Sequence, residues 1–302
     1  MVERTEAPSS PNPGTILNLP TTLYWDAIAR EWATANRQRL WREYCDQLNA
    51  RLLRRWLPAT PGVRLLKTDL FDEATATGGL FPALAAASRA VVGIDLSMVT
   101  LRRARARHQG LAGVAADVRR LPFAEQRFDL IVSNSTLDHF PSLAEVSTAL
   151  RELRRVLRVG GHLLLTIDNR SNPIVAIRNA LPDRLREGFG LVPYYVGASC
   201  GPTRLQRLVR AAGFEVEAAE ALMHCPRLLA VLVANLLDRL GRSTTRAAFT
   251  AHLLGWELLA RWPTRFLTGY FVALKAVRTA QPDNSAGSSL SLPVPARPPA
   301  GH

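Results

Sequence analysis

Short apolar segments alternate with amphipathic segments between residues 63 and 168, and this alternation constrains the fold more than any other feature of the sequence. Strands that alternate with helices form a parallel sheet that is covered by helices on both faces. The predicted strands are VRLLKT (63–68), AVVGID (90–95), GVAA (113–116), FDLIVSN (128–134), GHLLLTID (161–168), FEVEAA (214–219) and GYFVALKA (269–276). We expect the last strand to run antiparallel, so the prediction is an α/β protein with a seven-stranded, mostly parallel sheet.

The helices between these strands have recognisable ends. Ser97 is a predicted N-cap for the segment SMVTLRRARARH, and Gly110 follows that segment. Ser142 and Glu145 form a capping box for a helix that we expect to end before Gly160.

The chain divides into a central domain with additions on either side. Residues 1–19 and 281–302 are rich in Pro, Ser, Gly and Ala, and we predict two disordered tails. Apolar side chains at helical spacing predict an N-terminal helical cap over residues 20–60. Residues 61–280 form the α/β domain, with helical insertions predicted at about 170–202 and 225–265.

The formal net charge of +13 suggests an acidic partner, but the placement of the charge argues against nucleic acid. The arginines within 102–107 and 151–158 lie at helical spacing beside apolar residues, which is typical of the solvated face of a helix. No basic motif with interleaved aromatic residues accompanies them. We therefore predict no nucleic-acid partner.

The cysteines and the apolar runs bear on the cell compartment. Cys45, Cys200 and Cys225 are widely separated and lack metal-ligand spacing, so we predict neither disulfides nor a metal site. The first residues lack the apolar core of a secretory signal. The most apolar run, residues 228–237, is shorter than the roughly 20 residues of a membrane span. We expect a cytoplasmic protein without a transmembrane segment.

Three motifs, AVVGIDLS, AADVRRLPF and FDLIVSNSTLDHF, follow one another along the chain. In this order they resemble the class I S-adenosylmethionine (SAM) dependent methyltransferases, in the small-molecule branch related to ubiquinone and phospholipid methylating enzymes. The resemblance covers residues 63–168 by motif and 203–276 by topology. It implies a Rossmann-like domain, SAM as the cofactor, and in-line methyl transfer to O, N or C of a small-molecule or lipid-like acceptor.

The first two motifs imply cofactor contacts. Asp95 ends the second predicted strand, where one carboxylate accepts hydrogen bonds from both ribose hydroxyls, and Leu96 follows it. In the resembled family, Asp117 accepts a hydrogen bond from the adenine amine, and Val118 supplies a backbone amide and an apolar wall. The alternatives are a capping role for Asp95 and an exposed turn for Asp117.

The loop after the first strand departs from the family pattern, which has glycines there because only glycine lets the backbone approach the cofactor closely. Lys67 takes the place of the usual motif acid, and Asp69, Phe71 and Glu73 take the places of three glycines. We expect Asp69 or Glu73 to hold the amino group of SAM, with Phe71 packed near it and Thr68 among the cofactor contacts.

The third motif places polar residues after the fourth strand, at the edge where doubly wound sheets bind ligands. Ser133 and Asn134 are predicted cofactor contacts. Asp138 and His139 are the predicted catalytic residues, with His139 as a base that takes the proton of the acceptor. The alternative for His139 is that it orients the loop or packs beneath it, and the two readings stay open.

The predicted acceptor contacts are Asn169, Asn172, Tyr194 and Tyr195, in and beside the first insertion. Together with the N-terminal helices, the insertions are expected to roof the ligand edge and exclude water. Their alternative role is ordinary packing or a homodimer surface.

The altered first loop leaves two other functions open. One is an enzyme of the same fold but another reaction type, such as a cyclase or lyase of natural-product assembly. The other is a non-catalytic scaffold partner.

Overall fold

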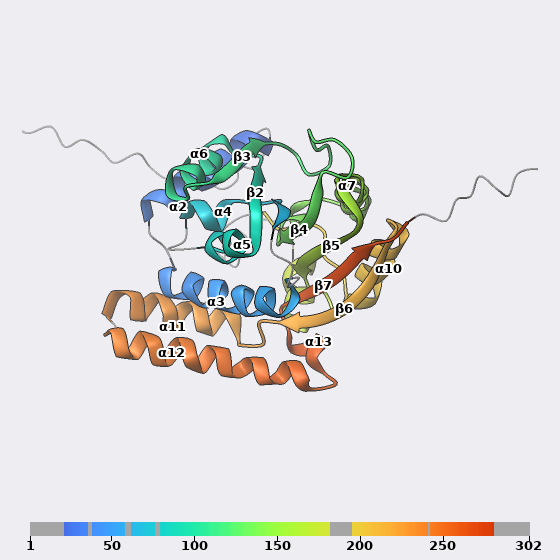
Figure 1. Ribbon diagram of the computed structural model, residues 1–302. Coiled ribbons are helices and arrows are strands. Elements are labelled where there is room, and N and C mark those ends of the chain that lie inside the picture. Colours follow the sequence, from blue (N-terminus) through green and yellow to red (C-terminus); the bar gives the residue numbers. More distant parts are fainter. Residues whose placement is uncertain are drawn as a thin grey trace, which may run out of the picture.

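The computed structural model describes residues 21–35, 38–57, 62–75, 79–181, 195–240 and 242–280. A seven-stranded sheet runs through its centre in the order β3-β2-β1-β4-β5-β7-β6 (Figure 1). The strands are β1 (Val63–Lys67), β2 (Ser88–Asp95), β3 (Leu111–Ala115), β4 (Phe128–Asn134), β5 (Leu157–Asp168), β6 (Phe214–Leu222) and β7 (Phe271–Arg278). Strands β1 to β5 are parallel, and β7 is antiparallel to β5 and β6. The predicted sheet is therefore confirmed, whereas the two predicted tails lie outside the described residues.

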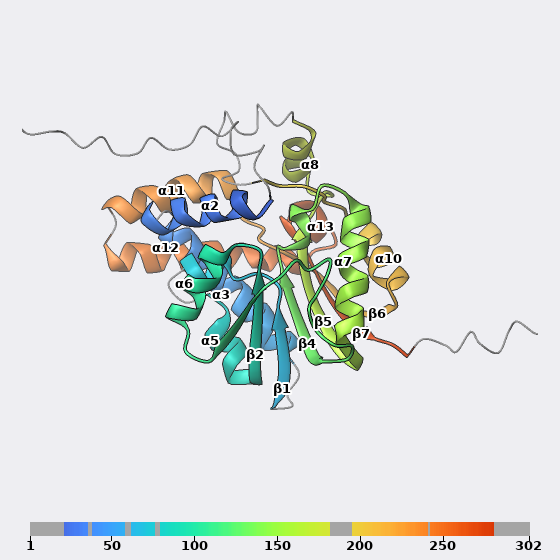
Figure 2. The ribbon, with the colours of Figure 1, turned by 90° about the horizontal axis from the view of Figure 1, so that it is seen from above.

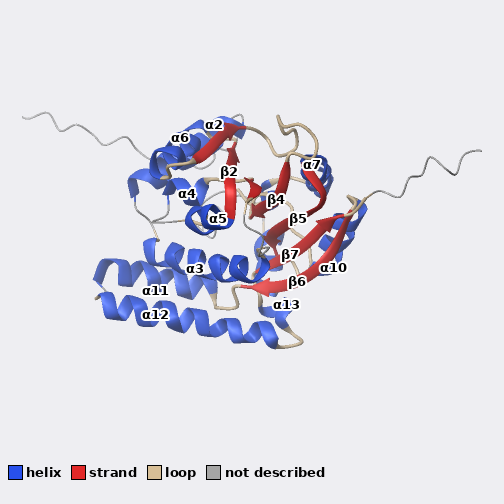
Figure 3. Cartoon of the chain, viewed as in Figure 1, coloured by secondary structure: helices blue, strands red, loops and turns tan. Residues whose placement is uncertain are grey.

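Helices flank the sheet on both sides (Figure 3). In the described part of the chain they are α2 (Thr21–Ala35), α3 (Arg39–Trp56), α4 (Phe71–Thr75), α5 (Phe81–Ala87), α6 (Met98–Arg107), α7 (Leu143–Val156), α8 (Pro173–Ala180), α10 (Pro202–Ala211), α11 (Arg227–Leu240), α12 (Ser243–Gly255) and α13 (Arg265–Thr268), with 3-10 turns η1 (Leu137–His139) and η2 (Trp256–Arg261).

The N-termini of α6 and α7 can be compared with the predicted N-caps. The Ser97 side chain accepts from the Thr100 amide and that of Ser142 from the Glu145 amide, so both predicted N-caps are confirmed. Helix α7 stops at Val156, before Gly160 as predicted, but β5 begins at Leu157 and not at the predicted Gly161, because Leu157 already pairs with β4.

The strands have an apolar core on each face. Leu65 of β1 packs in a core with residues of α3, α5, α6 and α11, while its neighbour Leu66 packs in a second core with residues of α7 and α10. Successive side chains of a strand point to opposite faces, so a strand buried on both sides is apolar throughout.

The N-terminal helices and the second insertion lie beside each other. Helix α3 packs against α11 and α12, and α2 packs against α4 and α6 (Figure 2). Asp26 of α2 accepts hydrogen bonds from the Ser97 hydroxyl and the Val99 amide, which ties α2 to the start of α6.

None of the helices described is long and apolar enough to cross a membrane. Among the described residues, no group of three or more His, Cys, Asp or Glu side chains is placed to hold a metal ion.

Candidate functional site

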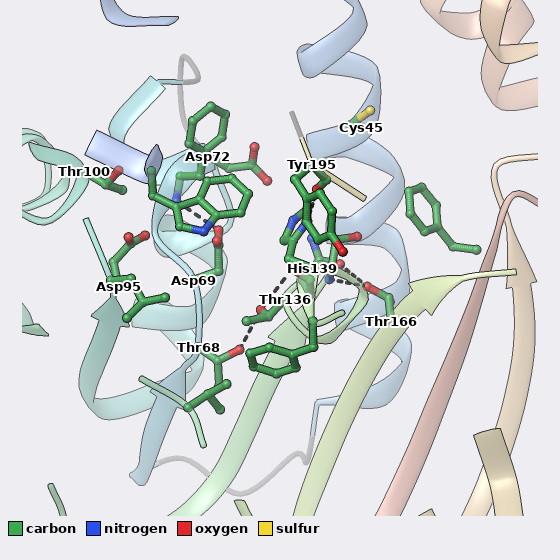
Figure 4. Close-up of a pocket in the computed structure, with 18 of the residues that line it drawn as sticks. Cys45, Thr68, Asp69, Asp72, Asp95, Thr100, Thr136, His139, Thr166 and Tyr195 are labelled. Carbon is green, nitrogen blue, oxygen red and sulfur yellow. Dashed lines mark hydrogen bonds between the residues drawn. The ribbon is translucent and has the colours of Figure 1, made fainter. Parts of the chain in front are cut away.

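A pocket of about 470 Å³ opens at the carboxyl ends of the parallel strands (Figure 4). Each parallel strand contributes a residue at or just beyond its end: Thr68, Asp95, Ala116, Asn134 and, from within β5, Thr166. Helices α2 and α3 line the pocket from the other side. This volume and this position are typical of small-molecule sites in doubly wound folds.

Asp95, at the end of β2, lines the pocket together with Leu96. The Leu70 amide donates to Asp95 Oδ2 (3.1 Å), and the Ser97 amide donates to Oδ1 (2.7 Å). Burial, with a contribution from the Asp69 carboxylate, raises the pKa of Asp95 to about 8. The carboxyl group is held in one orientation, and each oxygen retains a second acceptor position for a ligand.

Asp117 and Val118, after β3, line the same pocket. Asp117 is half-buried rather than exposed. Its Oδ1 accepts from the Arg119 amide (2.8 Å) and its Oδ2 from Arg119 Nε (3.0 Å), while Arg119 also pairs with Glu145. The ion pair fixes the position of the Asp117 carboxylate.

The segment after β1 forms the short helix α4, and its buried ion pair explains how a lysine is tolerated there. Lys67 Nζ lies 2.8 Å from Glu73 Oε2 and donates to the Asp69 carbonyl. Both side chains are buried, with exposed fractions of 1% and 0%. Glu73 is absent from the pocket lining, so the structure does not support its predicted contact with a cofactor. Its carboxylate neutralises Lys67 instead.

Asp69, Phe71 and Asp72 do line the pocket. Burial raises the pKa of Asp72 to about 7, with the nearby Asp46 adding to the effect, and burial also raises the pKa of Asp69. With Asp95, three crowded carboxyl groups therefore face one end of the pocket. Crowded carboxylates ionise together more readily beside a cation, so this end favours a positively charged ligand.

Arg42 is a pocket residue that the sequence analysis missed. Its exposed fraction is 7%, and its Nε and Nη1 atoms have no hydrogen-bond partner. The guanidinium lies 5.5 Å from the ring centre of Trp32, and burial lowers the pKa of Arg42. A buried guanidinium with unused donors favours an anionic oxygen. The spacing of Arg42, Cys45 and Asn49 along α3, all of which line the pocket, was the available signal.

His139 ends the 3-10 turn η1 and lies in the pocket beside Trp25, with ring centres 4.9 Å apart. Its Nδ1 lies 2.9 Å from the carbonyl oxygen of Tyr195. Because a carbonyl only accepts, Nδ1 carries the proton, and Nε2 of the neutral ring carries the lone pair. Tyr195, a predicted acceptor contact, also lines the pocket.

Three non-glycine residues that line the pocket have positive φ angles: Gln38 (58°), Ser135 (48°) and Met223 (61°). Such strained backbone is frequent at ligand sites, where the surrounding structure holds it in place.

Besides Glu73, four predicted site residues among those described lie outside the pocket lining. Ser133 is buried and accepts a hydrogen bond from Thr68 Oγ1 (2.9 Å), and Asp138, within η1, is buried with no hydrogen-bond partner for Oδ1. Asn169 and Asn172 donate to carbonyls of the 266–269 segment, so the structure gives both a role in packing that segment. Tyr194 lies outside the described residues.

Comparisons with known proteins identify the family. Residues 71–165 match the family model described as a methyltransferase domain. The demethylmenaquinone methyltransferase of Beutenbergia cavernae is 30% identical over 270 residues, which cover 87% of this chain and 92% of that protein. The chain belongs to the class I SAM-dependent methyltransferases.

Other relatives of this methyltransferase match over shorter regions. The malonyl-[acyl-carrier protein] O-methyltransferase of Pseudescherichia vulneris is 40% identical over 76 residues, 25% of this chain and 29% of that protein. The first curated relatives that the chain matches are covered over about half of their length or less. A SAM-dependent methyltransferase from Mesorhizobium loti shares the fold, with a TM-score of 0.50 and 20% identity over 76% of this chain and 96% of that one.

The pocket of this methyltransferase suits SAM, the cofactor of the family. SAM has two positive groups, an ammonium and a sulfonium, together with a carboxylate and a ribose diol. The crowded carboxyl groups of Asp69 and Asp72 match the positive groups, the orphaned donors of Arg42 match the carboxylate, and Asp95 matches the diol. The residues present therefore fit the cofactor although the glycines are missing.

Proposed function

We propose that this chain transfers the methyl group of SAM to O, N or C of a small-molecule or lipid-like acceptor. The observation that carries the proposal is one pocket that contains both Asp95, at the end of β2, and His139, after β4. A group that binds the ribose and a group that accepts a proton therefore face the same space. The SAM methyl group supplies the electrophile, and the protein orients the two reactants and excludes water.

The pocket residues suggest how SAM is held. Asp95 accepts hydrogen bonds from the ribose hydroxyls, beside Leu96 and Thr68. Asp117 and Val118 contact the adenine, with Asn134 nearby in the lining. Asp69 and Asp72 face the ammonium and sulfonium groups, next to Phe71, and Arg42 binds the carboxylate.

His139 acts as the base in this scheme. The Tyr195 carbonyl holds the Nδ1 proton, which leaves Nε2 to accept the proton of the acceptor. Asp138, which precedes His139 in η1, is buried and does not line the pocket, so we assign it a positioning role.

The acceptor is proposed to be apolar or to have an apolar part. The pocket wall away from the carboxyl groups contains Trp25, Trp41, Leu48, Leu222 and Phe271. Relatives named for demethylmenaquinone and for the malonyl group of acyl-carrier protein fit this class of acceptor. We propose that the chain acts in the cytoplasm, without a nucleic-acid partner, and the free thiols of its three cysteines are in keeping with a reducing compartment.

The test of the cofactor site is calorimetry with SAM. Asp95→Ala is expected to lower SAM affinity at least roughly a hundredfold, because two charge-assisted hydrogen bonds are lost. Glu125→Ala, at an exposed position outside the pocket, is the matched control, and circular dichroism checks the fold of both variants. Unchanged affinity in Asp95→Ala would remove the cofactor assignment.

The reaction type is tested by the products. Methyl transfer yields S-adenosylhomocysteine in equal amounts with a methylated acceptor, whereas a cyclase or lyase consumes no SAM. Turnover of a candidate acceptor with SAM left intact would refute the methyltransferase proposal.

A further inference from the structure

Helix α11 has a stripe of solvent-exposed leucines. Leu229, Leu232, Leu236 and Leu240 recur at helical spacing, and their exposed fractions range from 54% to 76%. The opposite side of the helix, with Ala230 and Ala234, is buried in the core shared with α3. In a helix of the protein core such a stripe is buried. An exposed apolar stripe is typical of a surface that binds a partner or a membrane.

Further exposed apolar side chains lie on neighbouring elements at the same edge of the sheet. They are Leu23 of α2 and Ile174 and Ile177 of α8. In Figure 2 the three helices lie toward the side of the molecule where α8 follows the carboxyl end of β5, but in Figure 1 α2 and α11 lie apart, with α3 between them. Arg227, the first residue of α11, lines the pocket, so the leucine stripe of this helix begins beside the pocket.

The charge around this apolar face is positive. Arg170, which precedes α8, is exposed, as are Arg239 and Arg242 at the end of α11. Asp238 is the one acidic residue within α11, and its carboxylate is turned toward α3, where it accepts from the Leu40 amide. The chain as a whole has a formal net charge of +13. A leucine stripe flanked by arginines is the pattern of helices that lie in an anionic lipid interface.

We propose that the exposed leucine stripe of α11 docks on the surface of an anionic lipid bilayer. The leucine stripe enters the boundary between headgroups and acyl chains, and the flanking arginines contact lipid phosphates. Because Arg227 at the start of α11 lines the pocket, docking brings the pocket close to the bilayer, where the lipid-like acceptor of the proposed function is found. The docking surface is separate from the residues that bind SAM.

Vesicle sedimentation of the full chain, without SAM, tests the proposal. The wild-type protein is expected to sediment with phosphatidylglycerol vesicles and more weakly with phosphatidylcholine vesicles, and added salt reduces the difference. Leu232→Asp/Leu236→Asp is expected to bind phosphatidylglycerol roughly a hundredfold more weakly. Val159→Asp is the matched control, because Val159 is 46% exposed near the start of β5, at the opposite edge of the sheet.

Arg239→Glu/Arg242→Glu is expected to lose the preference for anionic vesicles while keeping the weak binding to phosphatidylcholine. Circular dichroism and SAM calorimetry of every variant show whether the fold is intact. Because sedimentation is measured without SAM, failure to bind vesicles is distinct from failure to bind the cofactor.

Three results would overturn the proposal. They are no sedimentation of the wild-type protein with phosphatidylglycerol, equal binding by the leucine variant and the wild type, and a dimer by light scattering that the leucine substitutions dissociate while vesicles bind neither form. The last result would assign the face to a second copy of the chain.

Discussion

The buried pair of Lys67 and Glu73 is expected to be a major determinant of stability, although it lies below the binding site. The two side chains are 1% and 0% exposed, and Lys67 Nζ lies 2.8 Å from Glu73 Oε2. Burial lowers the pKa of Lys67, but the carboxylates of Glu73, Asp69 and Asp72 outweigh it, so the pKa is raised overall. Lys67→Met removes the cation that balances all three acids.

The expected cost follows from the burial of the group left behind. Removing one partner of a fully buried ion pair costs about 3–5 kcal/mol of unfolding free energy, a large share of the usual total. Lys67→Met is therefore expected to lower Tm by roughly 10 °C. Glu73→Gln is expected to cost less, because the Gln oxygen still accepts from the Leu80 amide and Asp69 and Asp72 remain beside Lys67.

The double variant Lys67→Met/Glu73→Gln completes a mutant cycle. It removes both charges of the pair and leaves only Asp69 and Asp72 without the cation, so its stability is expected to lie closer to the wild type than that of Lys67→Met. Urea denaturation followed by circular dichroism measures the four free energies, with Arg103→Met at an exposed position of α6 as the control. A cost below about 1 kcal/mol for Lys67→Met would refute the reasoning, because it would mean that the acids do not depend on Lys67.

Three further predictions concern the pocket. Arg42→Met is expected to lower SAM affinity at least about tenfold in calorimetry. Tm should not fall, because Nε and Nη1 of Arg42 have no hydrogen-bond partner in the protein to lose. An unchanged Kd would contradict the assignment of Arg42 to the SAM carboxylate. Asp95 and Asp72 have folded-state pKa values of about 8 and about 7, above the unfolded value, so the folded state holds more protons and its unfolding free energy should fall as pH rises from about 4 to about 8. SAM affinity should rise over the upper part of that range, because the cation binds the ionised carboxylates; a Tm that rises with pH or an affinity that falls would contradict this sign. His139→Gln is expected to lower kcat about 10²–10⁴-fold with little effect on SAM affinity, and full turnover would leave His139 a structural residue.

The alternation of strands and helices was enough to predict the sheet, because its period and its apolar runs are local properties of the sequence. The start of β5 was not predictable in the same way. The predicted strand began at Gly161, but the observed β5 begins at Leu157 and includes Gly160, which has a φ of 73°. Pairing of Leu157 with β4, which is a tertiary contact, decided where the strand begins.

The pocket residues at strand ends were also predictable, because parallel strands bring their carboxyl ends to one edge. Asp95, Asp117, Asn134 and His139 all line the pocket. Arg42 was missed because its role depends on how α3 packs beside Trp32, and a single helix does not encode that. Asn169 was misplaced for a related reason, since its side chain reaches carbonyls about a hundred residues further along the chain.

Replacement of the loop glycines changes the path of the backbone but leaves the pocket open. Leu70 lies so close to Gly93 that a Cβ there would be 2.5 Å from Leu70 Cδ2, so this bulky side chain is placed over β2 and away from the ligand. The same residue donates its amide to Asp95, and Phe71 packs edge-on against Trp32. With Glu73 folded onto Lys67, the side chains that replaced glycine are used to pack the loop and orient Asp95. A change in motif sequence is therefore compatible with the same cofactor, because the side chains of Asp69, Asp72 and Arg42, which line the pocket, are proposed to replace the contacts of the glycine backbone.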